Sequence, residues 1–250
     1  MNYLNIQAIK ISETEAKVLW AVSDSRRGAL VLRTTTPHPD IDILAELAAA
    51  KHLITDRNIL GNKVRNGVGV HLTFSKGAVK KLATGKSAKK HLQRYAAFLS
   101  SRLVGSKIEI QKKNERLPPA DTEPTEVISP DARTYIEVDT PALGPVQITD
   151  HALQRFIERF FPGKPENALK SLEERLMNAS LKPIKLPGSV QAHKDRKYGK
   201  EDRAVYRHPT DVVHFGVIDR QHQKILVTVF NRTDTQIASE MDEATEIEAS

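Results

Sequence analysis

The chain has 250 residues, 39% of them hydrophobic, and a formal net charge of +7 at pH 7. It contains no cysteine, which excludes disulfides, thiolate nucleophiles and cysteine-based zinc sites. No run of about eighteen apolar residues and no apolar stretch behind a basic start occurs. We therefore expect a cytoplasmic protein with no membrane partner, built as one large domain or two small ones.

Positive charge is concentrated in one segment of the chain. Residues 61–113 hold thirteen Lys and Arg side chains and a single acid, Glu109. Residues 234–250 hold six acids and no Lys or Arg, which predicts a disordered acidic tail. This asymmetry favours a polyanionic partner, most simply nucleic acid, although lysines that only solvate helix faces would give the same count. The lysines expected to contact nucleic acid are Lys80, Lys81, Lys86, Lys89 and Lys90.

The first 113 residues predict an α/β domain. Strands are expected over 4–11, 16–23 and 29–35, because residues such as Val18, Trp20 and Val22 alternate as in a half-buried strand and a turn-forming segment follows them. The remaining elements expected in this domain are a helix over 43–54, a strand over 69–74, helices over 76–82 and 88–103, and a strand over 107–110.

This order of elements over residues 1–113 resembles the ribonuclease H-like fold. Residues 44–50 (LAELAAA), which include Glu46, resemble the first helix of that family, where a catalytic Glu sits. Residues 70–76 (VHLTFSK) resemble the following strand and its exit, where a catalytic Asp normally stands. The resemblance implies clustered carboxylates that hold two divalent cations.

The carboxylates that this resemblance requires are mostly missing. The first strand offers none over residues 5–10, and the expected Asp position reads Phe74 or Ser75. Glu46 alone cannot organise a two-metal site, because hard cations need several oxygen ligands. We therefore expect a non-catalytic, basic domain without a metal, kept for binding nucleic acid or a partner.

Residues 114–145 differ sharply in composition from the segments around them. They contain six prolines and seven acids against two arginines. Prolines at this density prevent a continuous helix or a central strand. The segment is predicted to be an extended acidic linker, with at most a short strand over 134–138.

Residues 146–233 predict a small α+β domain of two helices followed by an antiparallel sheet. Leu153, Phe156 and Phe160 recur at three- and four-residue spacing in the first helix, and Pro165 suits the start of the second. The strands expected after the helices cover 181–186, 190–194, 203–208, 212–218 and 224–231. The expected fold class is therefore α/β plus α+β, in two domains.

A polar stripe runs along the first helix of this domain. His151, Arg155 and Arg159 are each four residues apart and so share one helix face. Phosphodiester chemistry can use an imidazole that moves protons near neutral pH and a guanidinium that holds phosphate; a plain solvated helix face is the alternative. The other cations expected to contact nucleic acid in this domain are Lys194, Arg196, Lys197 and Arg203.

Two pieces of this domain resemble the RelE-type and barnase-like metal-independent toxin ribonucleases of bacteria. They are residues 151–155 (HALQR) near a helix start and the strand over 225–230 (ILVTVF). The resemblance implies RNA cleavage by attack of the ribose 2′-hydroxyl on the adjacent phosphate, without a cofactor. His151 would act as acid or base and Arg155 as phosphate clamp, while Tyr206 and Thr228 could orient phosphate or relay protons.

The sequence thus predicts a metal-independent, toxin-like endoribonuclease that acts on RNA rather than DNA, with a protein inhibitor or host protein as a further partner. The alternative is a non-catalytic nucleic-acid-binding or adaptor protein of phage or plasmid type. A third hypothesis is a module that binds another protein. The enzyme is favoured if His151 and Arg155 converge on one phosphate with at least one of Lys194, Tyr206 and Thr228. Binding without cleavage is favoured if His151 points away from the sheet.

Overall fold

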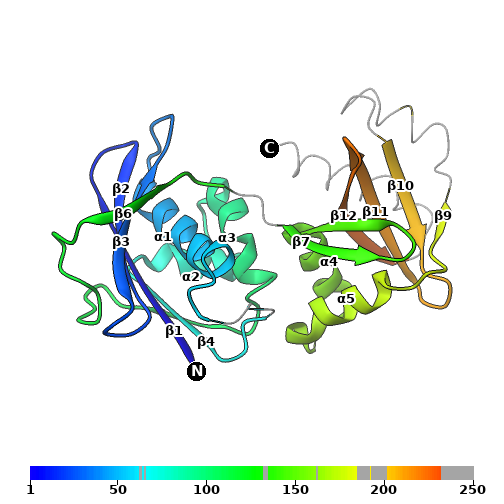
Figure 1. Cartoon of the computed structure of the whole chain (residues 1–250), viewed down its shortest axis with the longest axis horizontal. Coiled ribbons are helices and arrows are strands. Elements are labelled where there is room, and N and C mark those ends of the chain that lie inside the picture. Colours follow the sequence, from blue (N-terminus) through cyan, green and yellow to red (C-terminus); the bar gives the residue numbers. More distant parts are fainter. Residues whose placement is uncertain are drawn as a thin grey trace. The chain divides into compact units, whose positions relative to one another are not determined.

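A computed structural model describes residues 1–61, 64, 66–131, 135–161, 163–184, 192 and 202–231. The chain is a mixed α/β protein that divides into two compact units, Met1–Arg133 and Thr134–Ser250. Each unit has its own six-stranded sheet (Figure 1). No helix in the described ranges has both the length and the apolar character that crossing a membrane requires.

The sheet of the first unit mixes antiparallel and parallel strands. Its strands are β1 (Asn2–Lys10), β2 (Glu15–Ala21), β3 (Arg27–Arg33), β4 (Val70–Phe74), β5 (Lys107–Ile110) and β6 (Pro124–Ile128). They lie in the order β5-β4-β1-β2-β3-β6. The first three form an antiparallel meander, while β4 runs parallel to β1, β5 parallel to β4, and β6 parallel to β3.

Helices cover one face of this sheet (Figure 1). They are α1 (Ile41–Lys51), which continues into a π-helical turn η1 (His52–Asp56), α2 (Gly77–Ala83), a 3-10 turn η2 (Lys90–Leu92) and α3 (Gln93–Ser100). Leu4 and Ile6 of β1 pack in one core with Leu44 of α1, Leu82 of α2 and Phe98 of α3. Because strand residues alternate, Tyr3 and Asn5 lie on the opposite, helix-free face.

The order of strands and helices expected for residues 1–113 is confirmed. The helix expected over 88–103 is shorter, since α3 ends at Ser100 and its first turn is the 3-10 turn η2. The resemblance to the ribonuclease H-like fold stays a prediction.

Residues 114–145 differ from the extended linker that we expected. They contain β6, which we did not expect and which pairs with β3 at an edge of the first sheet. The short strand expected over 134–138 is confirmed as β7 (Tyr135–Thr140), which belongs to the second sheet. Pro124 is tolerated because it is the first residue of an edge strand, where a missing N–H costs no ladder bond. Leu117 packs with Leu19 and Ala29 on the helix-free face, so the segment completes the first unit.

The second unit starts with a hairpin before its helices. Its elements are β7, β8 (Gly144–Thr149), α4 (Asp150–Phe160), η3 (Pro165–Asn167), α5 (Ala168–Leu176), β9 (Lys182–Ile184), β10 (Asp202–Arg207), β11 (Val213–Arg220) and β12 (Gln223–Asn231). The strand order is β7-β8-β12-β11-β10-β9. The sheet is therefore not purely antiparallel as expected, because β8, which precedes the helices, lies parallel to β12.

The two helices of this unit pack on one face of its sheet. Leu153 and Phe156 of α4 and Leu172 of α5 share a core with Phe215 of β11 and Leu226 of β12. A smaller apolar cluster on the other face includes residues of β10, β11 and β12. The strand expected over 190–194 and the acidic tail over 234–250 lie outside the described residues, apart from Ala192.

Candidate functional site

Helix α4 begins at Asp150, so residues 151–155 lie near a helix start as expected. Thr149 caps the helix, since its Oγ1 accepts a hydrogen bond from the backbone N–H of Ala152 at 3.0 Å. Burial of the apolar face leaves His151, Arg155 and Arg159 half-buried along one side. The polar stripe is therefore present, as the four-residue spacing required.

The polar stripe is tied to protein groups. Arg159 Nη1 donates to the carbonyl of Val229 on β12 at 2.7 Å, and Arg155 Nη1 forms an ion pair with Glu158 at 3.1 Å. The Nε2 atom of His151 is buried. The Arg159 guanidinium, which we expected to bind phosphate, therefore holds α4 to the sheet with at least one of its N–H groups.

Tyr206 and Thr228 lie on opposite faces of the second sheet. Directly paired residues of neighbouring antiparallel strands share a face. Tyr206 pairs with Phe215, which belongs to the helix-side core. Thr228 pairs with Gly216, which in turn pairs with Val205 of the cluster on the other face. The two side chains cannot orient the same phosphate.

The local environment of each residue also differs from what catalysis would need. Thr228 has no exposed surface, and its hydroxyl finds no hydrogen-bond partner in the described part of the chain. Burial, with Asp202 and Asp219 nearby, raises the pKa of Tyr206. Arg203, expected to contact nucleic acid, is buried with 6% of its surface exposed. Lys194, Arg196 and Lys197 lie outside the described residues.

Glu46 lies where the ribonuclease H-like resemblance places catalytic carboxylates, and the protein itself occupies its oxygens. Oε1 accepts hydrogen bonds from the backbone N–H groups of Ala8 and Ser75 and from the Ser75 hydroxyl. Oε2 accepts one from the Lys76 N–H at 3.1 Å. The side chain is fully buried, which raises its pKa. Glu46 therefore fastens β1 and the exit of β4 to α1.

The lysines expected to bind nucleic acid lie on α2 and the segment that follows it. Lys80, Lys81, Lys86 and Lys90 are exposed, and none forms an ion pair with any residue that the structure describes. Lys89 differs, since its Nζ lies 2.6 Å from Asp40 Oδ1. We call the four unpaired side chains, at 80, 81, 86 and 90, the lysine cluster.

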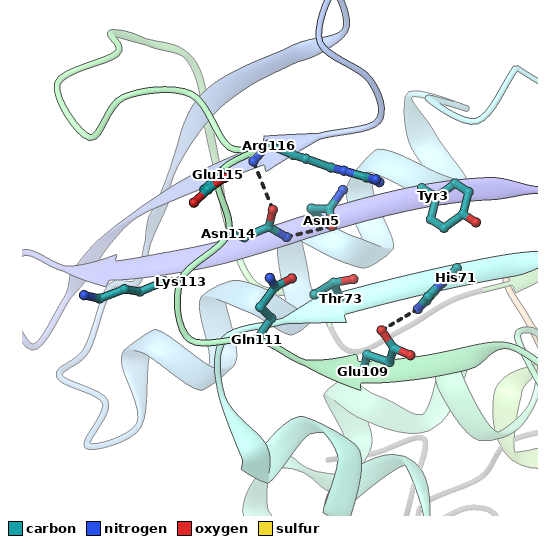
Figure 2. A pocket seen from close by; sticks show the side chains of 10 residues that line it. All are labelled: Tyr3, Asn5, His71, Thr73, Glu109, Gln111, Lys113, Asn114, Glu115 and Arg116. Carbon is teal, nitrogen blue, oxygen red and sulfur yellow. Dashed lines mark hydrogen bonds and ion pairs between the residues drawn. The ribbon is translucent and has the colours of Figure 1, made fainter.

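A pocket of about 510 Å³ opens on the helix-free face of the first sheet (Figure 2). Strand pairing places Tyr3 beside His71 and Asn5 beside Thr73. The segment after β5 crosses this face, where the Asn114 side chain donates to Asn5 Oδ1 at 2.8 Å. Three strands and one crossing segment thus enclose the pocket.

Two rings, a guanidinium group and a carboxylate gather at one end of the pocket (Figure 2). The rings of Tyr3 and His71 are 5.1 Å apart, and the Arg116 guanidinium carbon lies 5.7 Å from the centre of the Tyr3 ring. His71 Nε2 also contacts Glu109 at 3.0 Å. The pKa of the Glu109 carboxyl is lowered, mainly by a hydrogen bond from Lys107, whose Nζ lies 2.6 Å away. The hydrogen bond with His71 lowers it further.

This pocket was not predicted from the sequence. One signal was available: Tyr3 and Asn5 alternate with Leu4 and Ile6 on β1, which marks a strand with one polar face. Which polar faces meet depends on strand pairing, and sequence alone does not give that pairing.

No family model, curated protein or solved structure matches the chain. Both resemblances therefore stay predictions. Within the described ranges, no three His, Asp or Glu side chains gather so that they could hold a metal ion.

Proposed function

We propose that the chain is a nucleic-acid-binding protein that holds its polyanion on the lysine cluster of the first unit and does not cleave it there. The observation that carries this proposal is the cluster itself: four exposed lysines within eleven residues, without a carboxylate partner among the described residues. Unpaired ammonium groups bind phosphates and release condensed counterions.

Local structure keeps these lysines in solvent. Val79 and Leu82 of α2 are buried in the core, so the helix presents Lys80 and Lys81 outward. Lys86 lies between α2 and η2, Lys90 is the first residue of η2, and both are exposed. Phosphate contacts of this kind give affinity without sequence preference. RNA is the polyanion that we test first.

The arrangement around Glu46 argues against metal-dependent cleavage in the first unit. A carboxylate that already accepts four protein hydrogen bonds has little capacity left for a hard cation, which needs several oxygen ligands. Binding is therefore the activity that this unit supports best.

Metal-independent RNA cleavage by the second unit is the second candidate. One observation favours it: His151 and Arg155 lie one turn apart on α4, and both keep part of their surface exposed. Thr228 lies on the sheet face opposite α4, which leaves this pair without one of the two strand residues expected to assist it.

The test measures RNA affinity and RNA integrity in the same samples. A labelled single-stranded RNA is titrated with the full chain and with a variant carrying Lys80→Gln, Lys81→Gln, Lys86→Gln and Lys90→Gln. The control removes the same charge at exposed lysines elsewhere, with Lys10→Gln, Lys164→Gln, Lys170→Gln and Lys182→Gln. We expect the first variant to bind on the order of a hundredfold more weakly at roughly 0.1 M salt and the control to bind nearly as the parent does.

RNA integrity separates binding from catalysis. Gels of the same samples, with EDTA or with Mg²⁺, are expected to show intact RNA. Cleavage that survives EDTA and disappears in His151→Ala would establish the second candidate. Equal weakening by both lysine variants would contradict a role for the lysine cluster.

A further inference from the structure

We propose that the pocket on the helix-free face of the first sheet binds a nucleoside monophosphate, either free or as the phosphorylated end of a strand. The pocket shares no residue with the lysine cluster, so the proposal stands apart from the function proposed above. Its size, about 510 Å³, lies within the range of small-ligand sites.

One end of the pocket suits a planar ring. Tyr3, His71 and Arg116 gather there, with the Tyr3 ring 5.1 Å from the His71 ring and 5.7 Å from the guanidinium carbon of Arg116. Aromatic rings and guanidinium planes stack on nucleobases. Tyr3 and His71 are paired positions on β1 and β4, so strand pairing brings their two rings side by side at this end of the pocket.

The floor between the ends offers unused hydrogen-bonding groups. Among the residues that the structure describes, the hydroxyl of Thr73 and the carboxamide of Gln111 have no hydrogen-bond partner. Each can both donate and accept, as base edges and ribose hydroxyls require. Asn5 is already used, since it donates to the Ala21 carbonyl at 3.2 Å and accepts from Asn114.

Charge favours an anion over a neutral ligand. Lys113 and Arg116 line the pocket and form no ion pair within the described ranges. The charge of Glu109 is balanced by Lys107, whose Nζ lies 2.6 Å from its carboxylate. Glu115 offsets part of the remaining positive charge from an exposed position.

A single ligand can contact the ring end, the polar floor and Lys113 at the same time. Figure 2 shows Lys113 at one end, Tyr3 and His71 at the other, and Thr73 and Gln111 between them. A base at the ring end, a ribose over the floor and a phosphate toward Lys113 use all three regions. An apolar ligand would bury the polar floor without hydrogen bonds, which is costly, and inorganic phosphate would leave the ring end empty.

The first test is calorimetric titration of the full chain with uridine monophosphate, adenosine monophosphate, uridine and inorganic phosphate. We expect a monophosphate to bind, and uridine and phosphate each to bind at least about tenfold more weakly, because each lacks one set of contacts. Thr73→Val and Lys113→Gln should each weaken the monophosphate about tenfold. Lys112→Gln, a neighbouring exposed lysine outside the pocket, should leave binding unchanged, with circular dichroism confirming that every variant folds.

The second test distinguishes the two sources of the ligand. A short RNA with a terminal phosphate is compared with the same RNA without it, using uridine monophosphate as competitor. Tighter binding of the phosphorylated strand than of the same strand without the phosphate, reversed by the competitor, identifies a strand end; equal binding of the two strands identifies a free nucleotide.

The proposal is overturned if none of these probes binds, or if binding is unaffected by Thr73→Val and Lys113→Gln. It is also overturned if binding is lost only in the variant without the lysine cluster. In each of these cases RNA binding by the lysine cluster can still hold, so the two proposals fail separately.

Discussion

Glu46 is a buried carboxylate whose role follows from its hydrogen-bond partners. From the sequence, the segment around Glu46 resembles the helix that carries a catalytic Glu in the ribonuclease H-like fold, but the other carboxylates of a two-metal site are mostly missing. The structure adds that Ala8, Ser75 and Lys76 supply four donors to Glu46. Sequence could not show this, because those donors are mostly backbone N–H groups, and their direction depends on how α1 packs against β1 and β4.

The pH dependence of stability tests the environment of Glu46. Burial raises the pKa of Glu46 above its unfolded value of 4.5, so its protonated form favours the folded state. Its contribution is fully present below pH 4.5 and is lost as pH rises through the folded pKa. Glu46→Gln has the same shape but does not titrate. The stability of the parent relative to Glu46→Gln should therefore decrease from pH 4 to pH 7, as measured by urea unfolding. A difference that is constant with pH would contradict this account.

Thr228 gives a second test at the scale of one residue. Its hydroxyl is fully buried and has no partner in the described part of the chain. Thr228→Val removes this unsatisfied group at nearly constant shape and should stabilise the protein by about 1 kcal/mol. Thr228→Ser, which keeps the hydroxyl and loses a methyl group, should destabilise it by about 1 kcal/mol. Thermal unfolding measures both, and destabilisation by Val would reveal a hydrogen bond that this account denies.

At the scale of elements, the spacing of apolar residues predicted much of the secondary structure. It did not predict which strands pair with one another. The apolar spacing of α4 and the alternation on β2 were sufficient to place both elements. The position of β8 beside β12 could not be read from the sequence, because the strands are separated by two helices and three strands. For the same reason, the sequence could not show that Tyr206 and Thr228 lie on opposite faces of the second sheet, since the face of each residue depends on the register of strand pairing.

Strand β6 explains why composition misled us over residues 114–145. Proline and acid density signalled a linker, and local composition contains no information on the open edge of β3 that this strand covers. Leu117, which precedes β6, packs on the helix-free face of the first sheet, and Ile128, the last residue of β6, packs in the core on the helix side. A boundary at 113 would cut through that unit.

Two fragments test where the first unit ends. Residues 1–131 should unfold cooperatively in urea. Residues 1–113 should be less stable by at least about 3 kcal/mol, because they lack Leu117 and Ile128, and a buried side chain of this size contributes about 1.5–3 kcal/mol. Circular dichroism across a urea series measures the difference. Equal stability of the fragments would show that β6 and Leu117 contribute nothing to the unit.

At the scale of the whole molecule, charge distribution was the most useful signal in the sequence. It singled out the lysines at 80, 81, 86 and 90, and the structure leaves them exposed. It also singled out Lys89, which Asp40 neutralises in part; this contact joins residues 49 positions apart and is invisible to a local count. A local count cannot find the pocket for the same reason, since its lining comes from residues 3–5, 71–73 and 109–116, which are far apart in the sequence.

The salt dependence of RNA affinity is the most direct measurement of the central claim. For a single strand, the slope of log K against log salt changes by about 0.7 for each phosphate contact. Removing the lysine cluster by four Lys→Gln substitutions should therefore make the slope shallower by about 3, while the RNA stays intact. An unchanged slope, or loss of the RNA to cleavage, would contradict the account.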